Sequence, residues 1–138
     1  MTRATPSAAP RQPLTVLVAE DEALVRLMLA DELREHGLQV IEAVDAEEAL
    51  SVLSNVPIDA VIVDLHMRKF RDGLAVAQYV RRHLPTIPVI LASLETPSVH
   101  EQSLFDVFFV KPYSPETIAA WIKRHHASTS QLKARQSA

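Results

Sequence analysis

The stretch VIVDLHM, residues 61–67, carries the pattern that decides the fold. The residues Val61, Ile62 and Val63 are β-branched, and three in a row favour a strand that is buried on both faces. Asp64 follows them directly, although a carboxylate is costly to bury without a partner. We therefore expect Asp64 to lie where a buried strand reaches a cleft at the edge of a sheet.

Short apolar runs alternate with helical patterns along the rest of the chain. This alternation predicts an α/β fold, in which helices cover both faces of a parallel sheet. Helices are predicted after each strand, the first over residues 23–36. The predicted strands cover residues 14–19, 39–44, 59–64, 87–92 and 106–110.

Capping signals indicate where the remaining helices begin. The second helix opens at Asp45, and Glu48 stands at the capping-box position three residues later. The third follows Gly73 and ends before a proline. Thr96 and Ser114 are each followed by proline, a combination that predicts the starts of the fourth and fifth helices.

Length and composition restrict the classes of protein. A chain of 138 residues suits one domain, predicted over residues 14–126 between polar tails at 1–13 and 127–138, although Leu132 could extend the last helix. The net charge of −3 has no basic block, which argues against direct binding to nucleic acid. No run approaches the roughly 18 apolar residues of a membrane span. With no cysteine, we expect a cytoplasmic, soluble protein.

Charged and hydroxyl side chains follow the predicted strands where they end. In a parallel sheet these ends share one edge, so the side chains should converge there. Three acids and one lysine leave an excess of about two negative charges, which a divalent cation could cancel. An all-oxygen site with room for water favours Mg²⁺, and the lack of cysteine argues against zinc. The converging residues are Glu20, Asp21, Asp64, Ser93 and Lys111.

A carboxylate beside a divalent cation and an ammonium group can attack phosphorus. In phosphoryl transfer the surroundings mainly position the reacting groups and neutralise oxygen charge. Asp64 is the natural phosphoryl acceptor in this set. The site residues thus predict phosphoryl chemistry at one carboxylate.

Four motifs in order, VAEDE, VIVDLHM, LAS and VKPY, resemble the receiver domain of two-component response regulators. The resemblance spans almost all of residues 14–126. It implies a flavodoxin-like, doubly wound (βα)5 fold with a five-stranded parallel sheet in the order 2-1-3-4-5. It also implies phosphoryl transfer from a histidine kinase or a histidine phosphotransfer protein, an unknown downstream protein target, and a monomer or weak homodimer.

The same resemblance assigns roles to individual residues. Asp64 would be the phosphoacceptor, with catalytic support from Ser93 at the phosphoryl group and Lys111 as its ion-pair partner. Asp21 and Asp64 would bind Mg²⁺ together with the backbone carbonyl of His66. Glu20 would join the metal site directly or through water. The residue before Pro112 would form a cis bond, as is frequent in this family.

The sequence also departs from the family pattern. The loop after Asp64 carries Arg68 where proline is usual and is slightly longer than usual. The stretch from Ser93 to Lys111 is short by about one helical turn, so the fourth helix should be stunted or irregular. Phe108 stands at the position of an aromatic switch, but plain packing explains it almost equally well.

Three other functions compete with that of a phosphorylated receiver. A phosphorylation-independent binding module is the main alternative, although Asp64 and Lys111 argue against it. An aspartate-nucleophile phosphohydrolase would place a second aspartate where this chain has His66. A nucleotide or flavin binder is disfavoured because the chain has two glycines and no glycine-rich phosphate loop.

The predicted first helix has more apolar residues than one buried face needs. Val25, Met28, Leu29 and Leu33 could face the sheet, which leaves Leu24 and Leu27 more exposed. We expect this surplus to dock a helix of the phosphodonor.

Overall fold

The computed structural model describes residues 13–67 and 72–137. Its elements are β1 (Thr15–Ala19), α1 (Ala23–Glu35), β2 (Gln39–Ala43), α2 (Ala46–Asn55), β3 (Ala60–Val63), α3 (Asp72–His83), β4 (Val89–Ser93), the short 3₁₀ helix η2 (Gln102–Leu104), β5 (Val107–Val110) and α4 (Pro115–Ser137).

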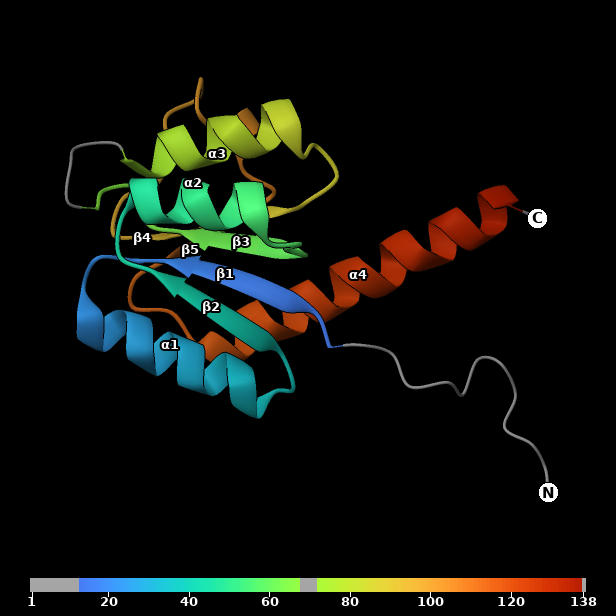
Figure 1. Cartoon of the computed structure of the whole chain (residues 1–138), viewed down its shortest axis with the longest axis horizontal. Helices are drawn as coiled ribbons and strands as arrows, with labels where there is room; N and C mark the ends of the chain where they lie inside the picture. The colour runs from blue at the N-terminus through green and yellow to red at the C-terminus, as the bar shows by residue number, and fades with distance from the viewer. Residues whose placement is uncertain (1–12, 68–71, 138) are drawn as a thin grey trace.

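The strands form one parallel sheet in the order β2-β1-β3-β4-β5. Both the parallel α/β class and this strand order are as predicted. Figure 1 shows α2 and α3 on one face of the sheet and α1 and α4 on the other. All strands run in one direction, so their carboxyl ends lie along a single edge.

Alternation along the strands divides the core between the two faces. Leu17 and Val61 pack in the cluster that contains residues of α2 and α3. Val16 and Ile62, each one position away, pack in the cluster that contains residues of α1 and α4. A strand buried on both faces has no polar side, which explains the continuous apolar run that precedes Asp64.

The predicted N-cap of α2 at Asp45 is confirmed. The Asp45 side chain accepts a hydrogen bond from the Glu48 backbone N–H at 2.8 Å. Glu48 accepts in return from the N–H of Val44, at 3.1 Å. The return bond goes to the residue before the cap and not to the cap itself. The two bonds still satisfy donors at the helix start.

The predicted fourth helix, opening at Thr96 and Pro97, is wrong as an α-helix. After β4 the chain forms turns and only the 3₁₀ helix η2. The physical reason is length, because residues 94–106 must leave β4 and return to β5, which leaves too little chain for a full helix and two connections. The expected shortening of this helix is confirmed in its extreme form.

Arg81 of α3 holds this short connection in place. Its guanidinium donates to the Leu104 carbonyl at 3.1 Å and to the Asp106 carboxylate at 2.6 Å. The same Asp106 oxygen accepts from the Val89 backbone N–H at 2.7 Å. A polar clamp therefore joins α3, the connection and the start of β4.

The last helix extends beyond the body of the domain. Helix α4 begins at Pro115, as predicted, and continues through Ser137, well past the predicted domain end at residue 126. Its last turns project away from the body in Figure 1. Among the described residues, no helix is long and apolar enough to cross a membrane.

Candidate functional site

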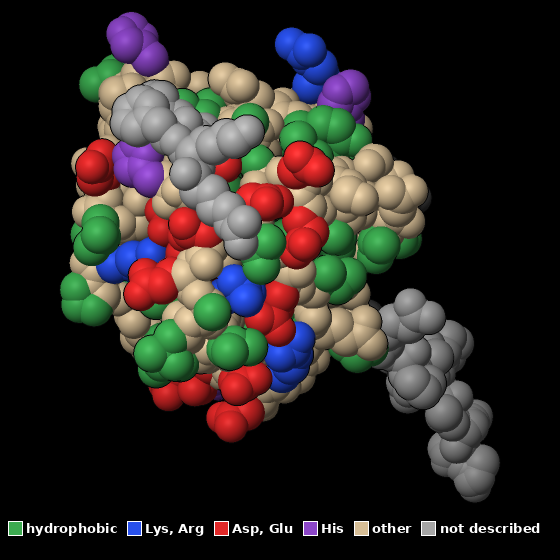
Figure 2. Space-filling model, turned by 60° about the vertical axis from the view of Figure 1, so that its left-hand side comes forward, with side chains coloured by type: hydrophobic (Ala, Val, Ile, Leu, Met, Phe, Trp, Pro, Cys, Tyr) green, Lys and Arg blue, Asp and Glu red, His purple; other side chains and the backbone are tan. Residues whose placement is uncertain are grey.

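Three polar side chains are buried where the strands end. Glu20 follows β1, Asp64 follows β3 and Ser93 closes β4, with 4%, 8% and 2% of their surfaces exposed. Lys111 follows β5 on the same edge. Figure 2 shows acidic side chains gathered over this face of the molecule. The convergence predicted from the parallel sheet is therefore present.

Lys111 joins two of these acids directly. Its Nζ lies 2.7 Å from Glu20 Oε1 and 2.7 Å from Asp64 Oδ2. All three side chains are largely buried. Charge-assisted hydrogen bonds of this kind are the strong ones, and removing one partner would strand a buried charge.

Backbone groups hold the other carboxylate oxygens. The Glu22 N–H donates to Glu20 Oε2 at 3.3 Å, and the His66 N–H donates to Asp64 Oδ1 at 3.2 Å. Each carboxylate oxygen has more than one acceptor position, so room for a further ligand remains. Both acids are thus oriented by the chain and still able to bind a cation.

Burial raises the pKa of the Glu20 carboxyl from 4.5 to about 7, with the Asp64 charge adding to the effect against the opposing pull of Lys111. Burial alone would lower the pKa of Lys111, but its hydrogen bonds to Asp64 and Glu20 raise it well above the usual value. Lys111 therefore stays charged, while the pocket resists a full set of negative charges.

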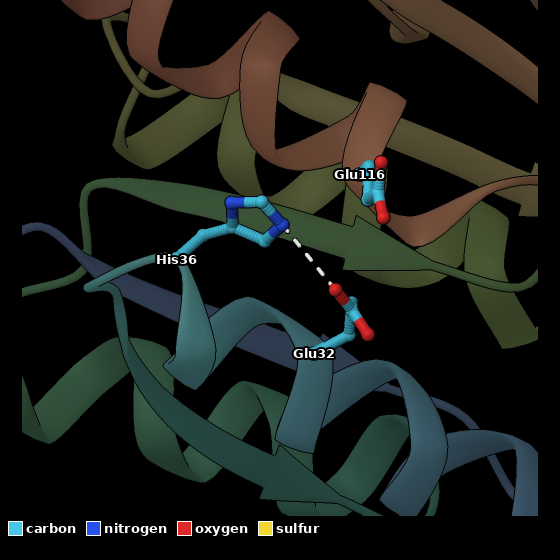
Figure 3. Close-up of side chains that lie close together, drawn as sticks. All are labelled: Glu32, His36 and Glu116. Atoms are coloured by element: carbon cyan, nitrogen blue, oxygen red, sulfur yellow. Dashed lines mark ion pairs between the residues drawn. The ribbon is translucent and has the colours of Figure 1, made fainter.

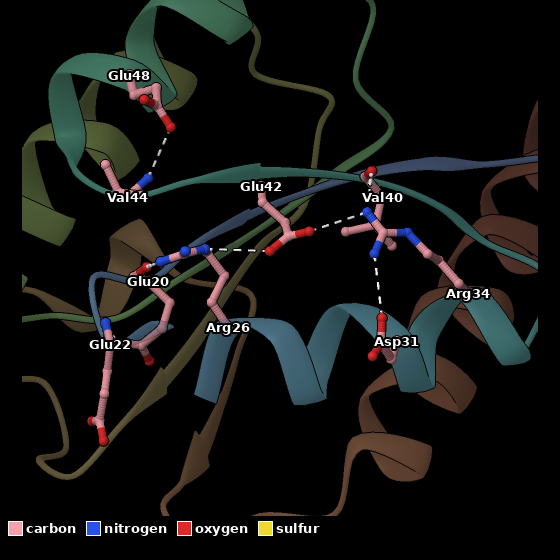
Figure 4. Close-up of polar contacts among 9 residues, drawn as sticks. All are labelled: Glu20, Glu22, Arg26, Asp31, Arg34, Val40, Glu42, Val44 and Glu48. Atoms are coloured by element: carbon pink, nitrogen blue, oxygen red, sulfur yellow. Dashed lines mark hydrogen bonds and ion pairs between the residues drawn. The ribbon is translucent and has the colours of Figure 1, made fainter. Parts of the chain in front are cut away.

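A second ionic network fixes the backbone beside Glu20. Arg26 of α1 donates to the Glu20 carbonyl at 2.9 Å and to Glu42 Oε1 of β2 at 3.3 Å. Arg34 holds the other Glu42 oxygen at 3.2 Å. Figure 4 shows the network running along α1 and across to β2. It ties the end of β1 to two neighbouring elements.

Gly73 lies against the backbone of the predicted phosphoacceptor. Its N–H donates to the Leu65 carbonyl at 3.1 Å, and a Cβ at this position would collide with the Asp64 carbonyl oxygen. The start of α3 can therefore approach Asp64 only because residue 73 has no side chain. The sequence alone marked Gly73 merely as a helix start.

The remaining predicted residues lie at or near the same edge. Asp21 directly follows Glu20 and is partly buried. The Lys111-Pro112 bond is cis, as expected. Phe108 is 38% exposed on β5, whereas its neighbour Phe109 packs against the cluster on the α1 and α4 face. The two rings thus differ in environment, and the switch role of Phe108 stays a prediction. Arg68 lies outside the described residues.

One pair at the site was not anticipated from the sequence. The His66 imidazole Nε2 lies 3.1 Å from Glu95 Oε2, so the loops that follow β3 and β4 meet beside Asp64. The sequence did contain a signal for this pair. His66 and Glu95 each lie two residues after the residue that ends a strand region, Asp64 and Ser93, and β3 and β4 are parallel neighbours in the sheet. The pattern of residues around His66 indicated only a loop residue near the site.

The donor set fits a magnesium ion. Glu20, Asp21 and Asp64 contribute three carboxylates and Lys111 one ammonium group, which leaves an excess of about two negative charges. Burial is the main cause of the raised pKa of Glu20, and the nearby charge of Asp64 adds to it. Hard oxygen ligands at a sheet edge suit Mg²⁺, which retains several waters.

Residues 16–123 match the response regulator receiver domain. The chain belongs to this family. Among solved structures, the receiver is similar to TrrA of Thermotoga maritima, in complex with Mg²⁺ and BeF, at 28% identity and a TM-score of 0.74, covering 80% of this chain and 97% of that one. A CheY-like receiver from Methanospirillum hungatei, 17% identical with a TM-score of 0.78, supports the fold, covering 86% of this chain and 98% of that one.

Curated relatives of this receiver are longer regulators. The chain is 36% identical over 111 residues to the probable transcriptional regulator ycf27 of Porphyridium aerugineum, covering 78% of this chain and 46% of that protein. It is 36% identical over 118 residues to the transcriptional regulatory protein PdtaR of Mycobacterium tuberculosis, covering 83% and 57%. The receiver thus spans about half the length of these relatives. They support a receiver role in two-component signalling.

Proposed function

We propose that this receiver takes a phosphoryl group onto Asp64 from a phosphohistidine of a histidine kinase or a histidine phosphotransfer protein. The observation that carries the proposal is the buried cluster in which Lys111 binds both Asp64 and Glu20 at 2.7 Å. A plain turn aspartate would have no need of a buried lysine and a second buried acid. The ion pair with Lys111 fixes the position of the Asp64 carboxylate, which could then act as a nucleophile.

In this reaction a carboxylate oxygen of Asp64 attacks phosphorus. A P–O bond forms, the P–N bond to the donor imidazole breaks, and its electron pair returns to the imidazole nitrogen. Lys111 then pairs with a phosphoryl oxygen, and the Ser93 hydroxyl, buried on the neighbouring strand, donates a hydrogen bond to another. The contacts from Lys111 and Ser93 both stabilise the negative charge on the oxygens of the transferred phosphoryl group.

Mg²⁺ would neutralise phosphoryl oxygens when it is bound. Asp21, Asp64 and the His66 backbone carbonyl would hold the ion, and Glu20 would join directly or through water. Glu20 and Asp64 are already oriented for this by backbone N–H groups. The four residues supply oxygen ligands only, in agreement with the preference of Mg²⁺.

An apolar groove beside the cluster suits docking of the donor helix. It has a volume of about 440 Å³, and α1 supplies one wall while the segment after β5 supplies the other. Met28 and Leu94 line it and are 63% and 74% exposed. Met28 was predicted to face the sheet, which is wrong, because Leu29 and Leu33 already fill that face. Lys111 lines the same groove, so a docked helix would lie next to Asp64.

Phosphorylation would switch the affinity for a downstream protein. The acyl phosphate adds charge and acceptor oxygens beside Ser93, at the end of β4, and β5 is its neighbour. β5 carries the exposed Phe108 and Val110, which offer a surface for such a partner. We place the protein in the cytoplasm, as a monomer or weak homodimer, with residues 14–126 as the receiver.

Mass spectrometry of the intact protein tests the proposal. With acetyl phosphate and Mg²⁺ we expect one added phosphoryl group, absent in Asp64→Asn and retained in Asp31→Asn, an exposed acid of α1. No adduct with acetyl phosphate or with phosphorylated donors would favour a phosphorylation-independent binding module. Steady turnover of a phosphomonoester that depends on Asp64 would favour a phosphohydrolase.

A further inference from the structure

Three side chains with metal-ligand chemistry meet between the end of α1 and the start of α4. Glu32 lies in the last turn of α1, His36 is the residue that caps this helix, and Glu116 lies in the first turn of α4. One ligand atom of each lies within 4.8 Å of the other two. Figure 3 shows the three side chains reaching toward one another from the two helices.

The spacing on α1 is that of a helical chelate. Residues four apart lie on one face of a helix, so a carboxylate and an imidazole can share an ion. The His36 Nε2 atom already lies 3.3 Å from Glu32 Oε2, with about a third of each side chain exposed. The third side chain, Glu116, belongs to α4, which is remote from α1 in sequence. Its approach to the other two therefore results from tertiary packing and not from local helix formation.

Ordinary structural roles explain the parts but not the whole. An i,i+4 ion pair accounts for Glu32 and His36, and an acid in a first helical turn accounts for Glu116. Neither role requires two carboxylates to approach each other. Among the described residues, no lysine or arginine forms an ion pair with either glutamate. Two like charges this close repel each other, and a cation bound between them would relieve the repulsion.

We propose that Glu32, His36 and Glu116 form a binding site for a transition-metal ion of the Zn²⁺ class. An imidazole nitrogen with two carboxylate oxygens suits zinc and disfavours Mg²⁺, which takes oxygen ligands. Metal–ligand bonds of about 2.0 to 2.2 Å place tetrahedral ligand atoms roughly 3.4 Å apart. Rotation of the exposed Glu116 side chain closes the remaining distance, and water completes the coordination.

Bound metal would join α1 to α4 at the end of the donor groove. Met28 and Leu29 of the groove lie one turn before Glu32, and Pro115 of the groove directly precedes Glu116. The ion would therefore set the spacing of the two groove walls. This consequence rests on the proposed function, whereas metal binding by the three residues does not.

Titration calorimetry with Zn²⁺ tests the site on Asp64→Asn, which lacks the proposed phosphoacceptor. We expect one bound ion, and at least tenfold weaker binding in both His36→Gln and Glu116→Gln. His126→Gln, an exposed histidine of the same α4 helix, is the matched control and should bind as the parent does. Co²⁺ should give a d–d absorption band that both variants lose.

Equal Zn²⁺ affinity in the parent, His36→Gln and Glu116→Gln would overturn the site, and so would a loss confined to His126→Gln. Circular dichroism and thermal unfolding without metal check that each variant is folded. The groove consequence has its own readout, the rate of phosphotransfer from a phosphorylated donor with and without Zn²⁺. An unchanged rate of phosphotransfer with bound Zn²⁺ would overturn the proposed effect of the metal on the groove, but not the metal site itself. The proposed function would also stand, because the acetyl phosphate reaction tests it separately.

Discussion

The Lys111 ammonium nitrogen lies 2.7 Å from an Asp64 carboxylate oxygen, and both side chains are largely buried. The two residues are far apart in the chain and meet because β3 and β5 end at the same edge of the sheet. The same ammonium group holds Glu20. Three charges thus form one unit, and any change to one alters the other two.

Replacement of Lys111 by methionine should lower the free energy of unfolding, on the order of 2 kcal/mol, because two buried carboxylates lose their shared partner. Protonation of Glu20 limits the loss. Urea unfolding in EDTA measures it, and Lys123→Met, at an exposed lysine, is the control. Added Mg²⁺ should restore part of the stability. A loss no larger than that of the control would show that the lysine is not needed for charge balance.

The pH dependence of stability should report Glu20. Its pKa is raised from 4.5 to about 7, so the folded protein keeps a proton that the unfolded chain releases. The stability from this proton is complete below pH 4.5 and is lost as the pH rises to about 7. Relative to Glu20→Gln, metal-free wild type should lose on the order of 2 kcal/mol over this range. Parallel curves for the two proteins would contradict the raised pKa.

Gly73→Ala should destabilise the fold by more than about 2 kcal/mol, because the added Cβ collides with the Asp64 carbonyl and the backbone must move. Chemical unfolding measures the effect. Gly37→Ala provides the comparison. An added Cβ at Gly37 would meet no neighbouring atom, so only the positive φ of this residue opposes a side chain there. If Gly73→Ala were as stable as wild type, the contact between α3 and Asp64 would be looser than described.

Met28→Glu should slow phosphotransfer from a donor protein at least tenfold, equal to about 1.4 kcal/mol, by placing a charge in the apolar groove. Acetyl phosphate, which needs no docking, should react at the wild-type rate. Leu27→Glu is the matched control, since Leu27 is exposed on α1 but does not line the groove. An equal loss in both variants would support the broader α1 surface around Leu24 and Leu27 expected from the sequence.

Arg81→Ala should cost on the order of 1 kcal/mol, because the clamp to Leu104 and Asp106 is partly exposed. The loss should be local. Hydrogen exchange should quicken in residues 94–106 and stay unchanged in β1 and β3. Arg82→Ala, at the exposed neighbouring arginine, supplies the control. Uniform acceleration across the sheet would mean that the clamp supports the whole domain and not the shortened connection.

The sequence by itself determined the sheet and the membership of the main site. Apolar runs of strand length alternate with helical patterns, and residues that follow parallel strands share one edge whatever the side-chain packing. The strand pattern alone therefore predicts that Glu20, Asp64, Ser93 and Lys111 lie together. The shortness of the stretch between β4 and β5 was also visible, because it is a matter of counting residues.

Only the tertiary structure decided which of these groups touch and which apolar residues remain exposed. Lys111 between Glu20 and Asp64, the His66–Glu95 pair, the exposure of Met28 and the approach of Glu116 to His36 each join elements remote in sequence. Periodicity reports which face of a helix is apolar, but not how far that face is covered by its neighbours. Such contacts depend on distances of a few ångströms between packed elements, which local pattern does not encode.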